Sequence, residues 1–188
     1  MRTSLDCVPC FIRQTLDAVR LISSDREVHE AIVREVLEWT SKIELDDSPP
    51  EMAQRIQRRL REITGEEDPY REIKEHHNLL AMRLLPEMQK KVGEAEDPLI
   101  LAARLAIAGN VIDLGASGNL DERDILKEVE RALAENFTGN SEEFRRAVEE
   151  SREILYLADN AGEIVFDRLL IEQLPPSKVV LAVRGRPV

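Results

Sequence analysis

The sequence predicts an α/β fold in which an N-terminal helical bundle is followed by the start of a parallel-sheet α/β/α (Rossmann-like) domain. Two observations predict this fold. Apolar residues recur at helical spacing from residue 7 to about residue 150. From residue 154 the pattern changes to apolar run, helical segment, apolar run, which is the order of a βαβ unit. We therefore expect a helical domain over residues 1–108 and the beginning of an α/β domain over residues 109–188.

Composition limits the class of protein. The chain has 188 residues, of which 43% are hydrophobic, so it can bury a sizeable core and is not disordered throughout. Its formal charge of −11 argues against a nucleic-acid binder, which needs a basic face. The sequence has neither a membrane-spanning apolar run nor a signal-like N-terminus, and its two cysteines suit a reducing compartment. We expect a cytoplasmic protein.

Helix signals recur at regular intervals in the first two thirds of the chain. Each of four helix starts combines a capping residue with Pro or Glu in the first turn: Ser24–Glu27, Ser48-Pro49, Asp68-Pro69 and Asp97-Pro98. The third of these helices should be kinked or broken near Pro86. The fourth is apolar nearly all round, so it should be buried, and it ends at Gly109-Asn110. Two amphipathic helices should follow, at about 121–136 and 141–151.

The βαβ unit comprises a strand over 154–158, a helix over about 162–173 and a second strand over 178–183. Both strands are continuous apolar runs, which is typical of a parallel sheet covered on both faces. A parallel sheet of two strands is too small to stand alone, so we expect a missing C-terminal segment or another chain to complete it. The alternative is that the second strand is an edge covered by helices.

Two polar residues lie at the tip of the first strand. Asp159 and Asn160 supply hard oxygen ligands of the kind that suit magnesium or manganese. Gly162 leaves room for close backbone approach, and the free N–H groups of the following helix start favour a phosphate. This layout fits a metal-assisted phosphoryl site. The alternative is an ordinary Asp cap on a helix that follows a strand.

Five landmarks occur in a fixed order along the chain: Cys7-Val-Pro-Cys10 with Gln14, Asp68-Pro69-Tyr70 with Lys74 and Asn78, Gly109-Asn110-Val-Ile-Asp113, Asp159-Asn160-Ala-Gly162-Glu163 and Val183-Arg-Gly185-Arg-Pro187. With them the chain resembles the N-terminal two-thirds of the metal-dependent damage-control phosphatases. The most similar group is the prokaryotic one with an N-terminal Cys-x-x-Cys. The resemblance covers essentially the whole sequence and implies a helical N-terminal domain followed by an α/β metal-binding domain.

The resemblance also implies a ligand set. Asp159 and Asn160 would bind a divalent metal, namely manganese, magnesium, cobalt or nickel. A further aspartate follows the Gly-x-Pro segment in the family, and a phosphate-binding lysine comes later still. This sequence reaches Val188 where the aspartate's motif would begin. We therefore expect the chain to carry part of the family's site.

Other residues have two possible roles each. Glu163 would orient a water or a group that contacts the ligands of the metal, or it is a plain acid in the first turn of a helix. The resemblance implies that Asn110 contacts substrate or phosphate and that Asp113 lies near the metal; the alternative is that Gly109-Asn110 simply ends a helix. Arg184, at the tip of the second strand, would bind phosphate oxygens, although a solvated arginine is an equal alternative.

Cys7 and Cys10 allow three interpretations. A thioredoxin-type dithiol needs a preceding strand, and only six residues come before Cys7, which argues against such an enzyme. A structural metal site would need two more ligands, for which His76 and His77 are candidates, with His29 as another. The third interpretation, which we favour, is that the thiols pack at a helix start.

These features favour a metal-dependent phosphatase that hydrolyses small phosphorylated metabolites, either sugar phosphates or damaged metabolite phosphates. The alternative is a non-catalytic helical interaction or regulatory module, because most of the chain is helical and the site is incomplete. A methyltransferase is a third class, but no Gly-rich loop of the usual kind follows the first strand.

Overall fold

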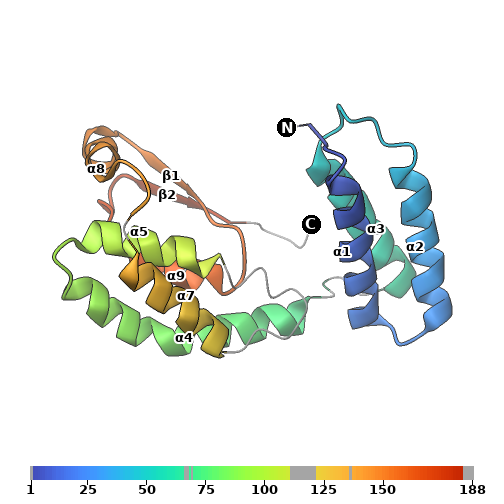
Figure 1. Ribbon diagram of the computed structural model, residues 1–188, viewed down its shortest axis with the longest axis horizontal. Helices are drawn as coiled ribbons and strands as arrows, with labels where there is room; N and C mark the ends of the chain where they lie inside the picture. Colours follow the sequence, from blue (N-terminus) through green and yellow to red (C-terminus); the bar gives the residue numbers. More distant parts are fainter. Residues whose placement is uncertain (1, 66–67, 69, 111–121, 136, 184–188) are drawn as a thin grey trace. The chain divides into compact units, whose positions relative to one another are not determined.

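The computed structural model describes residues 2–65, 68, 70–110, 122–135 and 137–183 (Figure 1). The predicted α/β class is confirmed, because a mostly helical chain carries a small parallel sheet. The elements follow one another as α1 (Cys7–Ile22), α2 (Arg26–Thr40), α3 (Pro49–Thr64), α4 (Arg71–Gly93), α5 (Pro98–Gly109), α7 (Glu122–Ala134), α8 (Ser141–Glu150), β1 (Ile154–Leu157), α9 (Glu163–Ile171) and β2 (Val179–Ala182). They form two compact units, one up to Arg71 and one from Glu72 onward.

The first unit is a three-helix arrangement in which α1 packs against α2 and α3. Its core is a cluster of buried apolar side chains: Phe11, Ala18, Val19, Ile32, Val36, Met52, Ile56 and Leu60. The predicted capping box at Ser24–Glu27 is displaced by one residue. Asp25 is the N-cap of α2, because its carboxylate accepts the Glu27 N–H at 2.8 Å, while Ser23 Oγ accepts the Asp25 N–H at 3.0 Å.

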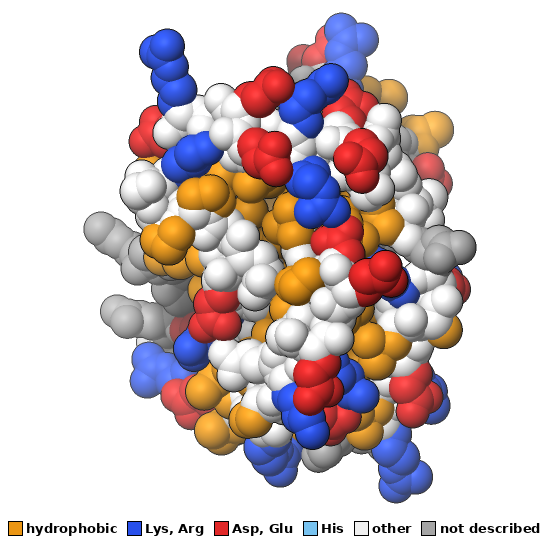
Figure 2. All heavy atoms as spheres, turned by 90° about the vertical axis from the view of Figure 1, so that its left-hand side faces the viewer, with side chains coloured by type: hydrophobic (Ala, Val, Ile, Leu, Met, Phe, Trp, Pro, Cys, Tyr) orange, Lys and Arg blue, Asp and Glu red, His pale blue; other side chains and the backbone are white. Residues whose placement is uncertain are grey.

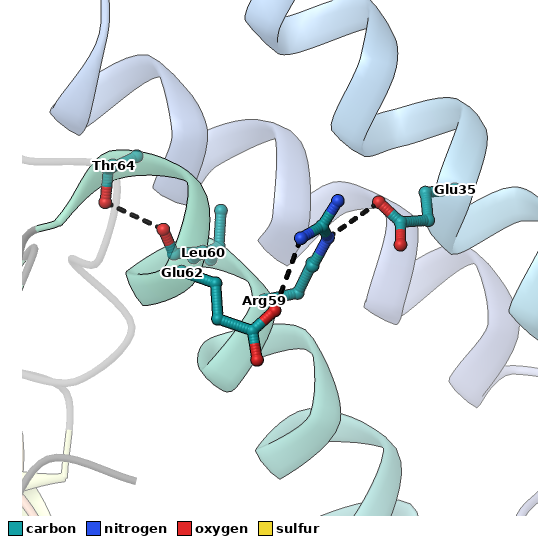
Figure 3. Close-up of polar contacts among 5 residues, drawn as sticks. All are labelled: Glu35, Arg59, Leu60, Glu62 and Thr64. Atoms are coloured by element: carbon teal, nitrogen blue, oxygen red, sulfur yellow. Dashed lines mark hydrogen bonds and ion pairs between the residues drawn. The ribbon is translucent and has the colours of Figure 1, made fainter.

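Arg59 links α3 to α2 at the surface of this unit (Figure 3). Its Nε lies 2.9 Å from Glu35 Oε2 on α2, and its Nη1 lies 3.2 Å from Glu62 Oε2 on its own helix. All three side chains are about a third exposed or more, so water screens these ion pairs and they add little to stability. The apolar cluster, rather than the ion pairs, therefore accounts for most of the stability of the unit.

The second unit is built around α5, which packs against α9 and α7. The core includes Leu80, Leu84 and Leu85 from α4, together with buried residues of α5, α7 and α9. We predicted a kink or a break near Pro86; helix α4 continues through this residue, so it is not broken there. Proline removes one N–H from the helix ladder, but Pro86 lies on the exposed face, where water can replace the missing donor.

The chain divides into its two compact units at a different position from the domain boundary that we expected between residues 108 and 109. The division falls between Arg71 and Glu72. The reason is that α4 and α5 supply Leu80, Ala102 and Leu105 to the same core as Phe166 of α9. Across the described part of the chain, none of the helices combines the length and the apolar character that crossing a bilayer requires.

Strands β1 and β2 pair in parallel, with Ile154 opposite Val179 and Leu157 opposite Ala182, and α9 is the crossover between them. Helix α9 contacts the face that carries Tyr156, because the tyrosine hydroxyl reaches Asp167 of that helix. The expected cover on both faces is not found among the described residues. Leu155 and Leu157, which share the opposite face, are 62% and 70% exposed.

Figure 2 views the second unit from the left of Figure 1 and shows hydrophobic side chains at the surface between charged ones.

A lysine side chain connects the end of α8 to the sheet. Lys178, just before β2, donates from Nζ to the carbonyl oxygens of Val148 and Glu149 at the end of α8. A cation at a helix C-terminus satisfies carbonyls that lack a partner inside the helix.

The contact between α5 and α9 should be sensitive to any added atom at Gly109. A Cβ there would lie 2.8 Å from Phe166 Cβ, which cannot move without the helix backbone. Gly109→Ala should therefore lower the free energy of unfolding by about 1–3 kcal/mol, as measured by urea denaturation. Gly93→Ala is the matched control, because the space around its Cβ position is open and alanine favours helix, so stability should be unchanged or rise by up to about 1 kcal/mol. Equal stabilities would contradict this packing.

Candidate active site at the tip of β1

The turn between β1 and α9 has the layout that the sequence predicted. Asp159 and Asn160 follow the strand directly, and Gly162 is the N-cap of α9. Gly162 is buried and has φ 81°, a left-handed conformation that side chains other than glycine rarely adopt. The turn closes on itself, since the Ile164 N–H donates to the Asn160 carbonyl at 3.2 Å. Asp159 is exposed and Asn160 is half-buried.

Glu163 determines how the Asn160 amide is oriented. Asn160 Nδ2 donates to Glu163 Oε2 at 3.1 Å, and the glutamate is only 7% exposed. An ionised carboxylate accepts hydrogen bonds but cannot donate them, so the amide nitrogen has to face it. Asn160 Oδ1 is therefore turned away from Glu163. Which of the two roles Glu163 has stays a prediction.

Gly162 is bound by a side chain from a distant part of the second unit. Its N–H donates to Asn78 Oδ1 of α4 at 2.7 Å, across 84 residues of sequence. The Val165 N–H also has a partner, the Gly162 carbonyl at 3.2 Å. The start of α9 consequently offers fewer free N–H groups to an anion than the sequence indicated. The role of Gly162 as a phosphate-binding residue remains a prediction, and its N–H is already engaged.

A second buried polar pair joins β1 to α9. Tyr156 donates from its hydroxyl to Asp167 Oδ1 at 2.6 Å, and Asp167 is 5% exposed. Burial raises the pKa of Tyr156 above its ordinary value, and the bond to Asp167 raises it further. Burial also raises the pKa of Asp167, although the tyrosine hydroxyl opposes this shift. Sequence analysis missed the pair, and the only signal was an acid on the apolar face of α9.

The other predicted site residues lie in several places. Asn110 is exposed at the C-cap of α5, and its N–H donates to the Ile107 carbonyl at 3.2 Å. Gly109, next to it, lies against Phe166 and near the Glu163 carbonyl, so the end of α5 adjoins the first turn of α9. Asp113 and Arg184 lie outside the described residues.

The Cys-x-x-Cys motif lies in the first turn of α1. Both thiols are free, Cys7 is half-buried beside the core of the first unit, and Cys10 is exposed. Cys7 Sγ lies 3.6 Å from Ser4 Oγ. The favoured interpretation, that the thiols pack at a helix start, therefore describes Cys7 and does not describe Cys10. His29, considered as a metal ligand, contacts the Ser23 carbonyl through Nε2 at 2.6 Å.

Two oxygen donors stand next to each other at the strand tip. Within the described ranges, His, Cys, Asp and Glu side chains do not gather in groups of three or more that could hold a metal ion. The carboxylate of Asp159 and the amide oxygen of Asn160 nevertheless have the donor chemistry that hard divalent ions prefer. They fit part of a coordination shell, and other ligands would have to complete it.

The chain is similar to a family of known proteins over nearly its whole length. Residues 3–188 match the family described as "Damage-control phosphatase ARMT1-like domain". A "Damage-control phosphatase" from Archaeoglobus fulgidus is 35% identical over 198 residues, covering 100% of this chain and 66% of the relative. A damage-control phosphatase from Pyrococcus horikoshii is 28% identical, covering 93% of this chain and 60% of that protein.

The structure is similar to a solved one as well. The crystal structure of a DUF89 family protein from Pyrococcus horikoshii superposes with a TM-score of 0.83 at 26% identity, covering 100% of this chain and 66% of that one. The chain thus spans between 60% and 66% of the length of these relatives.

The Tyr156–Asp167 bond should contribute measurably to stability. Tyr156→Phe would leave a buried carboxylate without this donor, so the free energy of unfolding at pH 7 should fall by about 1–3 kcal/mol. The raised pKa of Asp167 means that the folded state holds its proton to a higher pH than the unfolded state. Stability should therefore decline as pH rises above about 4, and Tyr156→Phe should extend that decline to higher pH.

Urea denaturation across pH tests this pair. Asp167→Asn is the matched variant, because its amide oxygen can still accept the tyrosine hydroxyl while its charge is absent. It should remove this part of the pH dependence. A Tyr156→Phe variant with the stability and pH profile of the parent chain would show that the bond contributes nothing.

Proposed function

Because this chain belongs to the damage-control phosphatase ARMT1-like family, we propose that it hydrolyses small phosphorylated metabolites at the tip of β1. The substrates would be sugar phosphates or damaged metabolite phosphates. One observation supports the assignment above the others. The adjacent oxygen donors Asp159 and Asn160 stand between a strand end and a helix start, with the Asn160 amide fixed by a buried Glu163.

A divalent metal, namely manganese, magnesium, cobalt or nickel, is part of this proposal. The Asp159 carboxylate and Asn160 Oδ1 would hold it. When bound, such an ion neutralises phosphate oxygens and lowers the pKa of a coordinated water, which supplies a nucleophile near neutral pH. Asn160 adds a ligand without adding a second negative charge that would repel the substrate.

The remaining residues would orient the substrate and the ligands. Glu163 holds the Asn160 amide in the orientation described above. Asn110, at the end of α5 and beside the first turn of α9, would contact the substrate. Gly162 leaves space for the phosphate to approach the backbone, and Arg184 would supply positive charge to phosphate oxygens. Local positive charge is needed because the whole chain carries a formal charge of −11.

We further propose that additional polypeptide covers the open face of the sheet, either a further C-terminal segment or another chain. Leu155, Leu157 and Val180 expose apolar surface on one side of two short parallel strands. Parallel sheets are normally buried on both faces, because exposed apolar surface and free strand edges favour association. The greater length of the relatives supports the same view.

Loss of the Asp159 charge should remove most of the metal affinity. Asp159→Asn should weaken manganese binding by at least about tenfold in calorimetry, because the segment Asp159–Gly162 then offers no formal charge to the ion. Hydrolysis of a generic phosphomonoester with saturating manganese should fall in parallel. Asp46→Asn is the control, since Asp46 is an exposed carboxylate of the first unit, 78% exposed and paired with Arg2.

Both readouts should be taken on the chain alone and on the chain fused to the last third of the Archaeoglobus fulgidus relative. If neither protein binds manganese or hydrolyses the ester, the phosphatase proposal is wrong. The non-catalytic helical interaction module would then be the better description.

The open sheet face should make the chain self-associate. Leu157→Lys should lower the associated fraction in analytical ultracentrifugation, because it places a charge in the exposed apolar face of β1. Leu5→Lys is the matched control, since Leu5 is 74% exposed but belongs to the first unit, which does not contain the sheet. A parent chain that is monomeric at high concentration would contradict this proposal.

A further inference from the structure

Asn78 occupies an unusual position for a helix cap. It lies on α4, yet its Oδ1 accepts the N–H of Gly162, the N-cap residue of α9. Most N-caps use their own side chain to satisfy the first N–H groups of a helix. Gly162 has no side chain that could cap α9. The polar side-chain contact at the start of α9 therefore comes from another helix.

Asn78, whose Oδ1 accepts the Gly162 N–H, lies on a part of α4 that is packed into the core. Leu80 and Ala81, which follow Asn78 closely on α4, are 2% and 0% exposed and belong to the same core cluster as Val165 and Phe166 of α9. The backbone positions of Asn78 and Gly162 are therefore both fixed by packing. A short bond of 2.7 Å between two such fixed points resists displacement of the turn that carries it.

The bond also acts on the conformation of Gly162 itself. A residue at φ 81° and ψ −51° gives the chain a sharp change of direction between Asn160 and Glu163. Glycine can adopt many other conformations at similar energy, so the contact with Asn78 acts together with the hydrogen bonds inside the turn to select this one. The Asn160–Glu163 hydrogen bond spans the same turn and depends on its shape.

We propose that Asn78 is a positioning residue for the site at the tip of β1. By holding the Gly162 N–H it fixes the turn that presents Asp159 and the Asn160 amide, so that the two oxygen donors are arranged before an ion arrives. This inference rests on the proposed function, because it concerns the same metal ligands. It adds that α4 takes part in the site, and that the Gly162 N–H serves the turn instead of the phosphate.

Three variants separate positioning from simple capping. Asn78→Leu removes the acceptor at similar volume, and Asn78→Asp keeps a carboxylate oxygen that can accept the same N–H. Asn140→Leu is the matched control, because Asn140 Oδ1 accepts the Glu143 N–H at 3.0 Å at the start of α8, away from the strand tip. Each variant is measured for urea stability, for manganese affinity by calorimetry, and for hydrogen exchange at the Gly162 amide.

Positioning predicts a selective loss. Asn78→Leu should accelerate exchange at the Gly162 amide and weaken manganese binding by at least about tenfold. Asn78→Asp should keep both within about threefold of the parent chain, because its carboxylate still accepts the Gly162 N–H. Asn140→Leu should lose stability and keep its manganese affinity. If Asn78→Leu does not fold, Asn78→Gln, which displaces the amide by one methylene, should still weaken binding in a folded protein.

A failure of the positioning role of Asn78 can be told apart from a failure of the proposed function. Manganese binding equal to that of the parent in Asn78→Leu, or in a folded Asn78→Gln, would overturn the positioning role and leave Asn78 as a structural cap. Absence of manganese binding in the parent chain and in its fusion would overturn the proposed function, and the inference with it.

Discussion

Helix α9 can lie close to α5 only because Gly109 has no side chain where the two helices touch. A Cβ atom on Gly109 would lie only 2.8 Å from Phe166 Cβ, and Phe166 belongs to the buried core of the second unit. This contact sets how deeply α9 enters the unit. Because α9 follows the turn at Gly162 directly, the same contact determines where the strand tip and its polar residues are held.

Two buried acids on α9 explain how the helix is attached to β1. Glu163 and Asp167 are four residues apart and therefore lie on the same side of α9, where two like charges would repel each other. Asp167 accepts a hydrogen bond from Tyr156 of β1, and Glu163 accepts one from Asn160 in the turn that follows the strand. A buried carboxylate needs such donors, so Asp167 ties α9 to the strand and Glu163 ties it to the turn. Asp159, in contrast, remains at the surface.

The sequence predicted the local features of this arrangement well. The strand, the polar tip, the glycine and the helix were predicted from a segment of about twenty residues, and the buried helix beginning after Asp97 was predicted from its apolar pattern. The sequence was misleading where two neighbouring residues can both cap a helix, as at Ser24 and Asp25. It was also misleading where the exposure of a proline determines whether the helix continues through it, as at Pro86. Asn78 was visible in the sequence as one landmark among others, but its partner was not, because periodicity and capping rules carry no information about contacts across 84 residues.

The separation between Asn78 and Gly162 has a consequence for how the protein is made. A ribosome adds about 5–20 residues per second, so Asn78 emerges about 4–17 s before Gly162. Helices α4 and α5 are complete during that interval, while the surface that Phe166 will cover is still open to water. The strand tip is thus among the last parts of the second unit to be assembled during translation. A nascent chain that stalls before β1 exposes the apolar faces of both helices to chaperones or to other nascent chains.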